Sequence, residues 1–254
     1  MIDTHAHLHD AKFDDDRAAV IERARMAEID TIVNVGCDVG DSLRALELAR
    51  EYRLYASVGI HPHEAKNAPA DIPAVFESFL RDSRVVAIGE AGLDYYYDHS
   101  PRDVQRHVLR EQLRLAREAG FPFIFHQRDA FDDFLAILRE EWQAPMRGVV
   151  HCFTGDAAQA QILTQEFGLF LGIGGVVTFK TAEPLREAVS AVGLGWLVLE
   201  TDCPYLAPIP HRGERNEPAY VALTANRVAE VLDLGVDEVV ATTDANARGL
   251  FALR

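Results

Sequence analysis

Histidine and acidic side chains crowd the start of the sequence, where residues 2–10 read IDTHAHLHD. If this segment is a β-strand, its side chains alternate between two faces, so His5 and His7 point the same way and Ala6 points the opposite way. Two imidazoles on one face can bind a single metal ion together. Two solvent-exposed histidines near a chain terminus would give the same short pattern, so this segment alone leaves both interpretations open.

Five further histidine or acidic residues lie at the end of short apolar runs or directly after them. They are His61 after YASVGI, Glu90 in VVAIGE, His126 in FPFIFH, His151 in GVVHCF and Asp202 after WLVLET. A carboxylate is costly to bury alone, and either a salt bridge to an arginine or a position between two cations would satisfy Glu90. A lone histidine in such a place is usually a hydrogen-bonded core residue. His126 and His151 together beside Glu90 favour ligands of a second metal ion.

Asp202 has two interpretations of its own. Aspartate is common in turns, where its side chain bonds to the nearby backbone. At the end of the last strand of a metal-binding barrel, the same carboxylate is a candidate to bind metal and to orient the attacking water.

The apolar runs belong to a regular alternation of predicted strands and helices. The eight predicted strands are 1–5, 31–36, 55–60, 85–90, 121–126, 148–153, 169–174 and 196–201. The helical stretches between them include 14–29, 41–52, 101–119, 129–141 and 216–232. Nearly continuous apolar strands indicate burial on both faces. Eight such units favour an α/β fold, a (β/α)8 barrel that forms a single domain over residues 1–254. The runner-up is an open doubly wound sheet, but no G-x-G-x-x-G motif follows the first strand.

The helix over 101–119 has clear boundary signals. Ser100 is a plausible N-cap, Pro101 fits the first turn, and Gly120 fits the C-terminal end. In a (β/α)8 barrel, the carboxyl ends of the strands form the face that carries the chemistry. Six of the predicted strands deliver a histidine or an acid to that face, which packing alone does not require.

The charge balance limits the partners. The sequence has 25 Lys and Arg against 40 Asp and Glu, a formal charge of −15. This field repels nucleic acid at long range and argues against wrapping a long duplex, whereas local arginines and bound metal can still reverse the sign inside a cleft. The expected contacts to substrate phosphate are His61, Arg128, Lys180 and Arg212. Arg215, in the same loop as Arg212, is better explained by a surface salt bridge.

Cys37, Cys152 and Cys203 are odd in number and far apart, which does not indicate a disulfide framework. No apolar run approaches the roughly 20 residues of a membrane helix, and the N-terminus does not have the layout of a secretory signal. We therefore expect a cytoplasmic protein with no membrane partner and no obligate protein partner.

The sequence as a whole resembles the TatD family of metal-dependent hydrolases, within the amidohydrolase-like barrels. The matching stretches are DTHAHL (3–8), GIHPH (59–63), AIGEAGLDYY (87–96), FHQRDA (125–130), HCFTG (151–155), GVVTFK (175–180) and TDCPYLAPIPHRGERNEPAY (201–220). This resemblance implies a distorted TIM barrel with a two-metal site. Carried over residue by residue, it implies that one metal is held by His5, His7, Glu90 and Asp202. The other metal is held by Glu90, His126 and His151.

The residues and the resemblance together predict a divalent-metal-dependent hydrolase. We expect two ions per chain, Mg²⁺, Mn²⁺ or Zn²⁺, that activate water to cleave a phosphodiester bond. The catalytic residues are expected to be Asp202, which orients the water and takes its proton, Glu90, which bridges the ions, and His61, which contacts phosphate or aids the leaving group. The resemblance alone implies an exonuclease that acts on DNA strand ends; small phosphodiesters are also possible substrates.

Two alternatives remain open from the sequence. One is a metal-dependent acyl or ester hydrolase, such as an enzyme similar to a D-aminoacyl-tRNA deacylase, in which the same metals polarise a carbonyl group. The other is a non-catalytic metal-binding scaffold. A complete ligand set disfavours the scaffold, which has no need of a water-orienting Asp202.

Overall fold

The computed structural model describes residues 1–253, and these fall into two units. The central unit is the continuous segment Val35–His151. The split unit combines Met1–Asn34 with the chain from Cys152 onward.

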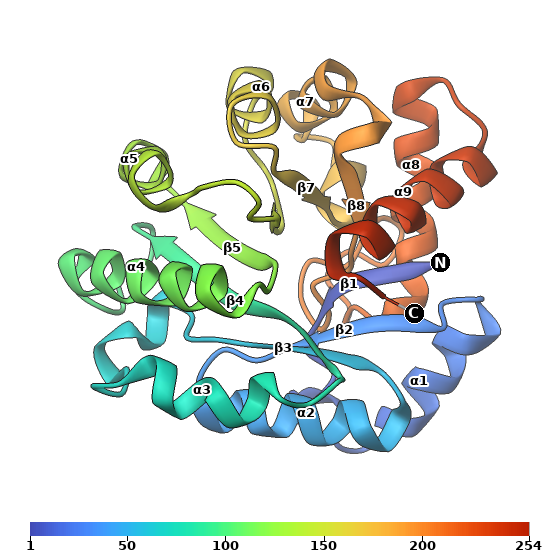
Figure 1. The fold of residues 1–254 in the computed structure, drawn as a ribbon. Coiled ribbons are helices and arrows are strands. Elements are labelled where there is room, and N and C mark those ends of the chain that lie inside the picture. The colour runs from blue at the N-terminus through green and yellow to red at the C-terminus, as the bar shows by residue number, and fades with distance from the viewer. Residues whose placement is uncertain (254) are drawn as a thin grey trace. The chain divides into compact units, whose positions relative to one another are not determined.

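Strands and helices alternate regularly in the central unit (Figure 1). Its parallel strands pair in chain order and are β3 (Tyr55–Val58), β4 (Val85–Asp94), β5 (Phe123–Arg128) and β6 (Gly148–Val150). Its helices are α2 (Val39–Tyr52), the 3-10 helix η2 (Pro62–Asn67), α3 (Ile72–Leu80), α4 (Arg102–Ala119) and α5 (Phe131–Glu141). Helical connections are what parallel strands require, because a tight turn cannot join them.

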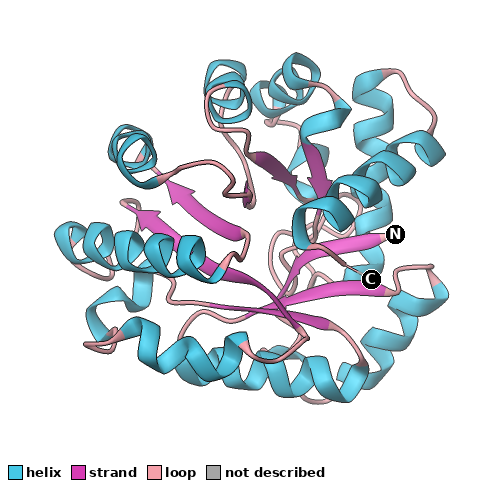
Figure 2. Cartoon of the chain, in the orientation of Figure 1, coloured by secondary structure: helices cyan, strands magenta, loops and turns pink. Residues whose placement is uncertain are grey.

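The split unit contains two pairs of parallel strands. They are β1 (Ile2–Ala6) with β2 (Thr31–Val35), and β7 (Phe170–Ile173) with β8 (Leu197–Leu199). Its helices are η1 (Ala11–Phe13), α1 (Arg17–Met26), α6 (Ala157–Gln165), η3 (Gly175–Thr178), α7 (Glu183–Val192), η4 (Leu194–Trp196), η5 (Pro218–Tyr220), α8 (Val221–Leu232) and α9 (Val236–Phe251). Figure 2 shows these helices in cyan and the strands in magenta. The start of β1 is tied to α9, since the Ile2 amide donates to Asp244 Oδ1 at 2.9 Å.

All eight predicted strands are present, with one difference that bears on the site. The strand predicted over 85–90 continues to Asp94, because residues 91–94 of β4 pair with residues 125–128 of β5. All ten residues of β4 are buried, as expected for a parallel strand covered on both faces.

The helix predicted over 101–119 is α4, and it ends at Gly120 in the left-handed conformation with φ of 75°. The predicted capping role of Ser100 is wrong. Its hydroxyl instead donates to the carbonyl of His63 and accepts from the amide of Lys66. The side chain therefore fixes the turn after β3 rather than the start of α4.

No helix within residues 1–253 is both long enough and apolar enough to cross a bilayer.

Gly92 lies where β4 approaches β5 most closely. A Cβ atom at this position would sit 1.8 Å from the carbonyl oxygen of His126 and 2.7 Å from its carbonyl carbon, and both are backbone atoms that cannot rotate away. The absence of a side chain therefore sets the spacing between the strands that carry Glu90 and His126.

We expect Gly92→Ala to destabilise the protein by about 2–4 kcal/mol, because the two strands must move apart in a tightly packed interior. Gly249→Ala is the matched control, since Gly249 lies in the exposed part of α9 with nothing within 4 Å of its Cβ position. That change should stabilise the protein by about 0.5–1 kcal/mol. Chemical denaturation measures both, and equal stability of the two variants would contradict this account of Gly92.

Candidate metal centre

The first strand and the segment after the last strand are held together by backbone hydrogen bonds in the split unit. The Asp202 amide donates to the His5 carbonyl at 2.8 Å, and the His7 amide donates to the Cys203 carbonyl at 2.8 Å. Asp202 has a φ of 57°, a left-handed conformation that aspartate tolerates better than most residues. These contacts bring residues almost 200 positions apart in the sequence side by side.

A buried carboxylate reinforces this junction. Asp3 Oδ2 accepts from the Thr201 hydroxyl at 2.6 Å, and Asp3 Oδ1 accepts from the Thr201 amide at 2.9 Å. Farther along the loop, buried Asn216 donates to the carbonyls of Thr201 and Tyr205. Both ends of the segment that presents Asp202 are therefore fixed.

Three predicted ligands meet in the split unit. The Nε2 atoms of His5 and His7 lie 3.2 Å apart, and Asp202 Oδ1 lies 3.4 Å from the Nε2 of His7 and 3.9 Å from that of His5. His5 and His7 are buried. The Nε2 atoms of His5 and His7 and the Oδ1 atom of Asp202 all lie close together. A single proton cannot form hydrogen bonds with all three atoms at once, whereas one metal cation can bind all three.

Arg215 is in the same loop, and its predicted surface salt bridge is confirmed. Its two terminal nitrogens contact the two carboxylate oxygens of Asp16 at 2.7 Å each, and one of them also donates to the carbonyl of Lys12.

The central unit gathers the other predicted ligands around Glu90, whose side chain is only 4 % exposed. Glu90 Oε1 lies 2.6 Å from His126 Nδ1, 2.8 Å from His151 Nε2 and 3.4 Å from His61 Nε2. These rings come from β5, the residue after β6, and the residues just after β3. Three different parts of the chain thus supply imidazole nitrogens to a single carboxylate oxygen.

The electrostatics of Glu90 follow from this environment. Burial raises the pKa of a carboxyl group, but the surrounding imidazoles of His151, His61 and His126 outweigh burial and hold the pKa of Glu90 well below its usual range. The group is therefore an anion that needs a positive partner in a buried place. Ligand atoms of His61, Glu90 and His126 all lie within 4.8 Å of one another, so the donor set fits a divalent cation.

His61 differs from the other rings in its hydrogen bonding. Its Nδ1 accepts from the His63 amide at 3.1 Å, so the proton of the neutral ring resides on Nε2, the atom that faces Glu90. Burial lowers the pKa of His61 to about 4, although the charge of Glu90 opposes that shift. The ring is thus a neutral hydrogen-bond donor at physiological pH, which suits contact with a substrate oxygen better than metal ligation.

Two buried glutamines on α4 position this site, and neither was among the residues predicted from the sequence. Gln112 accepts from the Ile60 amide at 2.7 Å and donates to the Ile60 carbonyl at 3.0 Å, next to His61. Gln105 accepts from the Asp94 amide at 2.8 Å and donates to the Asp94 carbonyl at 3.1 Å. The two glutamines are seven residues apart, about two helical turns, so they lie on the same face of α4. This spacing is visible in the sequence.

Asp94 and His63 were also missed. Asp94 Oδ2 lies 3.1 Å from His126 Nε2 and 3.0 Å from His63 Nε2. The predicted strand ended at Glu90, and His63 was not among the predicted ligands. The apolar residues AGL between Glu90 and Asp94 could have indicated a longer strand. In a longer strand, Asp94 points to the same side as Glu90 and so toward the same cluster.

The predicted substrate cations Arg128, Lys180 and Arg212 are exposed. The Arg128 guanidinium lies over the rings of Tyr96 and Tyr97, 4.0 and 4.9 Å from their centroids. In the split unit, the exposed Arg212 lies 4.3 Å from the ring centroid of Phe179, and Lys180 is exposed after η3.

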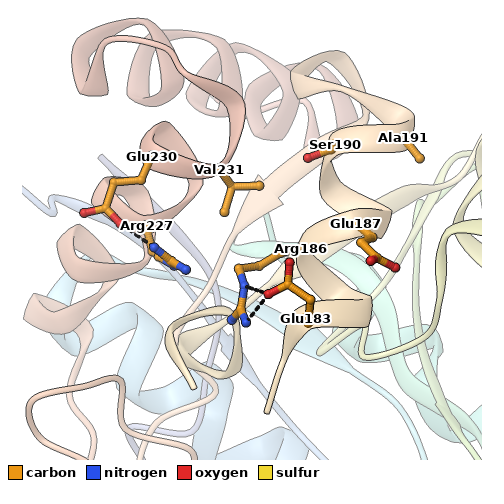
Figure 3. A pocket seen from close by; sticks show the side chains of 8 residues that line it. All are labelled: Glu183, Arg186, Glu187, Ser190, Ala191, Arg227, Glu230 and Val231. Carbon is orange, nitrogen blue, oxygen red and sulfur yellow. Dashed lines mark hydrogen bonds and ion pairs between the residues drawn. The ribbon is translucent and has the colours of Figure 1, made fainter. Parts of the chain in front are cut away.

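A surface hollow between α7 and α8 contains none of the predicted site residues. Figure 3 shows that its two arginines are each paired with an acid, Arg186 with Glu183 and Arg227 with Glu230. Their charges are already neutralised locally, which leaves this hollow without the features of a phosphate site.

The model of the TatD-related DNase family matches residues 2–252. The chain belongs to the TatD family. It is 42 % identical over 254 residues to an uncharacterised metal-dependent hydrolase, YabD, of Bacillus subtilis, covering 100 % of this chain and 99 % of that protein. It is 36 % identical over 260 residues to the 3′-5′ ssDNA/RNA exonuclease TatD of Erwinia amylovora, covering 100 % of both.

A solved TatD homologue, YjjV of Escherichia coli K12, is also similar to this chain. The two structures agree with a TM-score of 0.93 at 30 % identity, covering 100 % of this chain and 98 % of the other. The predicted α/β barrel class of the TatD family is confirmed, and the protein is a metal-dependent hydrolase of this family with histidine and acidic clusters that could bind metal.

Metal binding should stabilise the folded protein of this TatD family member. We expect Zn²⁺ or Mn²⁺, added to chelator-treated protein, to raise the melting temperature, since a ligand at 100 times its Kd contributes about 2.7 kcal/mol. Glu90→Gln should lose most of this increase. Glu141→Gln is the matched control, because Glu141 is buried in the same unit but pairs with Arg114. A full metal response in Glu90→Gln, measured by scanning calorimetry, would contradict the assignment.

Proposed function

We propose that this protein hydrolyses phosphodiester bonds at the ends of single-stranded nucleic acid, with DNA as its main substrate. The observation that carries the proposal is the contact of one buried carboxylate oxygen, Glu90 Oε1, with imidazole nitrogens of His126, His151 and His61. The exonuclease names of TatD relatives support the choice of substrate.

We propose two divalent ions per chain, Mg²⁺, Mn²⁺ or Zn²⁺. One would be held by His5, His7, Glu90 and Asp202, and the other by Glu90, His126 and His151. Such ions, when bound, lower the pKa of water and neutralise charge on a phosphoryl group. Nitrogen and carboxylate donors together suit all three of these metals to different degrees.

The remaining steps belong to side chains of the protein. Asp202 would orient the attacking water and accept its proton, as a carboxylate at a fixed position can do. His61 would donate its Nε2 proton in a hydrogen bond to a phosphate oxygen or to the leaving oxygen, consistent with the neutral state that its burial favours. Glu90 would act by holding both ions.

Substrate phosphates need positive partners because the chain carries a formal charge of −15. We propose Arg128, Lys180 and Arg212 for this role, with His61 at the reacting phosphate. Arginine can contact a phosphate through two nitrogens at once, which favours Arg128 and Arg212 as the more specific contacts.

We also propose that residues 1–254 act as one domain and that the protein works in the cytoplasm. Within residues 1–253, Cys37, Cys152 and Cys203 form no disulfide, as is usual in that reducing compartment. The acyl-hydrolase alternative is not favoured by the comparisons, and the non-catalytic scaffold does not account for an enzyme family match across residues 2–252.

Chelator-treated protein should shorten end-labelled single-stranded DNA stepwise only after Mg²⁺, Mn²⁺ or Zn²⁺ is added back. Asp202→Asn should lower the turnover number by about 10²–10⁴-fold and leave the melting temperature nearly unchanged, because the amide cannot accept the water's proton. Gel analysis of timed digests measures the rate and shows which strand end is attacked.

Asp156→Asn is the matched control, since Asp156 is an exposed helix N-cap in the split unit and asparagine caps equally well. Near wild-type turnover by Asp202→Asn would remove the proposed role of that residue. Metal binding without cleavage of any nucleic acid would redirect the search to carboxylic ester substrates.

A further inference from the structure

Asp94 is a fully buried carboxylate that no step of the proposed hydrolysis uses. It lies at the last position of β4, two residues beyond the closely packed Gly92. Burying an anion at this depth is costly unless every oxygen is hydrogen-bonded, so its surroundings indicate its role.

The two oxygens of Asp94 have separate partners. Oδ1 accepts from the backbone amides of Tyr96 and Tyr97, at 3.1 and 2.8 Å. Oδ2 lies 3.1 Å from His126 Nε2 and 3.0 Å from His63 Nε2.

This arrangement determines which nitrogen of His126 keeps its proton when a metal binds. Asp94 Oδ2 faces the Nε2 atoms of two imidazoles and accepts from them, so His126 Nε2 is a donor to Oδ2. His126 Nδ1 lies 2.6 Å from Glu90 Oε1 and shares a proton with that carboxylate. A bound cation would displace this proton, whereas the proton on Nε2 stays with Asp94.

We propose that Asp94 is a positioning residue that fixes His126 in the tautomer whose Nδ1 coordinates the metal. The proposal rests on the metal site of the proposed function, but not on the nature of the substrate. Through Oδ2 the same carboxylate orients His63, whose amide in turn holds His61. One buried group therefore sets the orientation of both a ligand and the proposed hydrogen-bond donor.

A purely structural role for Asp94 is less consistent with its contacts. Gln105 already binds both the amide and the carbonyl of Asp94, and Oδ1 alone satisfies the turn at Tyr96 and Tyr97. Oδ2 is left to the two imidazoles, which is the arrangement that tunes metal-bound histidines.

Asp94→Asn tests the proposal through metal affinity rather than activity. If the amide oxygen stays on the Tyr96 and Tyr97 amides, the NH2 group faces His126 Nε2 and favours the wrong tautomer. We expect the affinity for one Zn²⁺ per chain to fall about 10–100-fold, measured by chelator competition, with the second Zn²⁺ much less affected. Turnover should recover toward wild type as Zn²⁺ is raised.

Asp133→Asn is the matched control, because Asp133 is a partly exposed carboxylate of the same unit that accepts from Tyr95 and Arg106. Its Zn²⁺ affinity should be unchanged. Unchanged Zn²⁺ affinity in a folded Asp94→Asn protein would overturn the proposal. If the Asp94→Asn variant does not fold, nitrogen NMR of the Zn²⁺-loaded wild-type protein tests the proposal instead. A proton on His126 Nε2 would support the proposal, and Zn²⁺ bound to His126 Nε2 would overturn it.

The turn held by Asp94 Oδ1 carries a second, independent feature. Tyr96 and Tyr97 are 58 % and 49 % exposed, although large apolar rings usually lie inside. Their centroids are 4.8 Å apart with the rings perpendicular, and the Arg128 guanidinium covers part of both. Among residues 1–253, Arg128 has no carboxylate within ion-pair distance, although the chain is rich in acids.

We infer that Tyr96 is a stacking site for a base of single-stranded nucleic acid, with Arg128 on the adjacent phosphate, whereas the ring of Tyr97 already stacks on His99. Stacking on exposed aromatic rings tolerates any base, and a free guanidinium beside them supplies the charge that the acidic chain otherwise lacks. This inference rests on the nucleic-acid substrate of the proposed function.

Binding of a fluorescent single-stranded oligothymidylate to the non-cleaving Asp202→Asn protein tests this site. Adding Tyr96→Ala should weaken binding about 5–100-fold, whereas Tyr96→Phe, which keeps the ring, should change it less than twofold. Equal affinity of the Ala and Phe variants would overturn the stacking site alone. No binding by the parent Asp202→Asn protein would instead count against a nucleic-acid substrate.

Discussion

The burial of the Glu90 carboxylate is the constraint on which the central unit depends. An anion cannot remain charged in an apolar interior without partners of opposite charge or several hydrogen-bond donors. The chain meets this requirement with three imidazoles from separate strand ends, so the four strands must keep their order and spacing for the site to exist. Gly92 permits the close approach of β4 and β5 that this spacing requires.

The imidazoles are themselves held by polar groups one layer farther out. Gln112 fixes the backbone beside His61, Gln105 fixes the backbone of Asp94, and Asp94 fixes His126. All three side chains are fully buried. Gln105 and Gln112 both donate and accept hydrogen bonds, and Asp94 accepts hydrogen bonds through both of its oxygens. A site built in this way loses little free energy to side-chain ordering when a ligand binds, because the ordering is part of folding.

The split unit solves a related problem with backbone pairing. His5 lies on β1, His7 comes directly after it, and Asp202 follows β8, so only the pairing of these distant segments brings the three together. The hydrogen bonds between Asp3 and Thr201 strengthen the same junction. In both units, the ligand atoms lie at strand ends while the stability comes from the buried strands behind them.

The sequence by itself determined the strand and helix pattern, the family, and the residues that could bind metal. These features are local: alternation along an extended N-terminal segment predicts a common direction for His5 and His7, and an acid or histidine after an apolar run is visible in the sequence without its partners. Only the tertiary structure showed which polar residues hold the metal-site histidines and the backbone beside them. These residues are Asp94, His63, Gln105 and Gln112. Strand β4 extends to Asp94 because β5 pairs with its last four residues. Hydrogen bonds between segments far apart in the chain leave no periodic signal, so the tautomer of His126 could be assigned only once the partners of its two nitrogens were known.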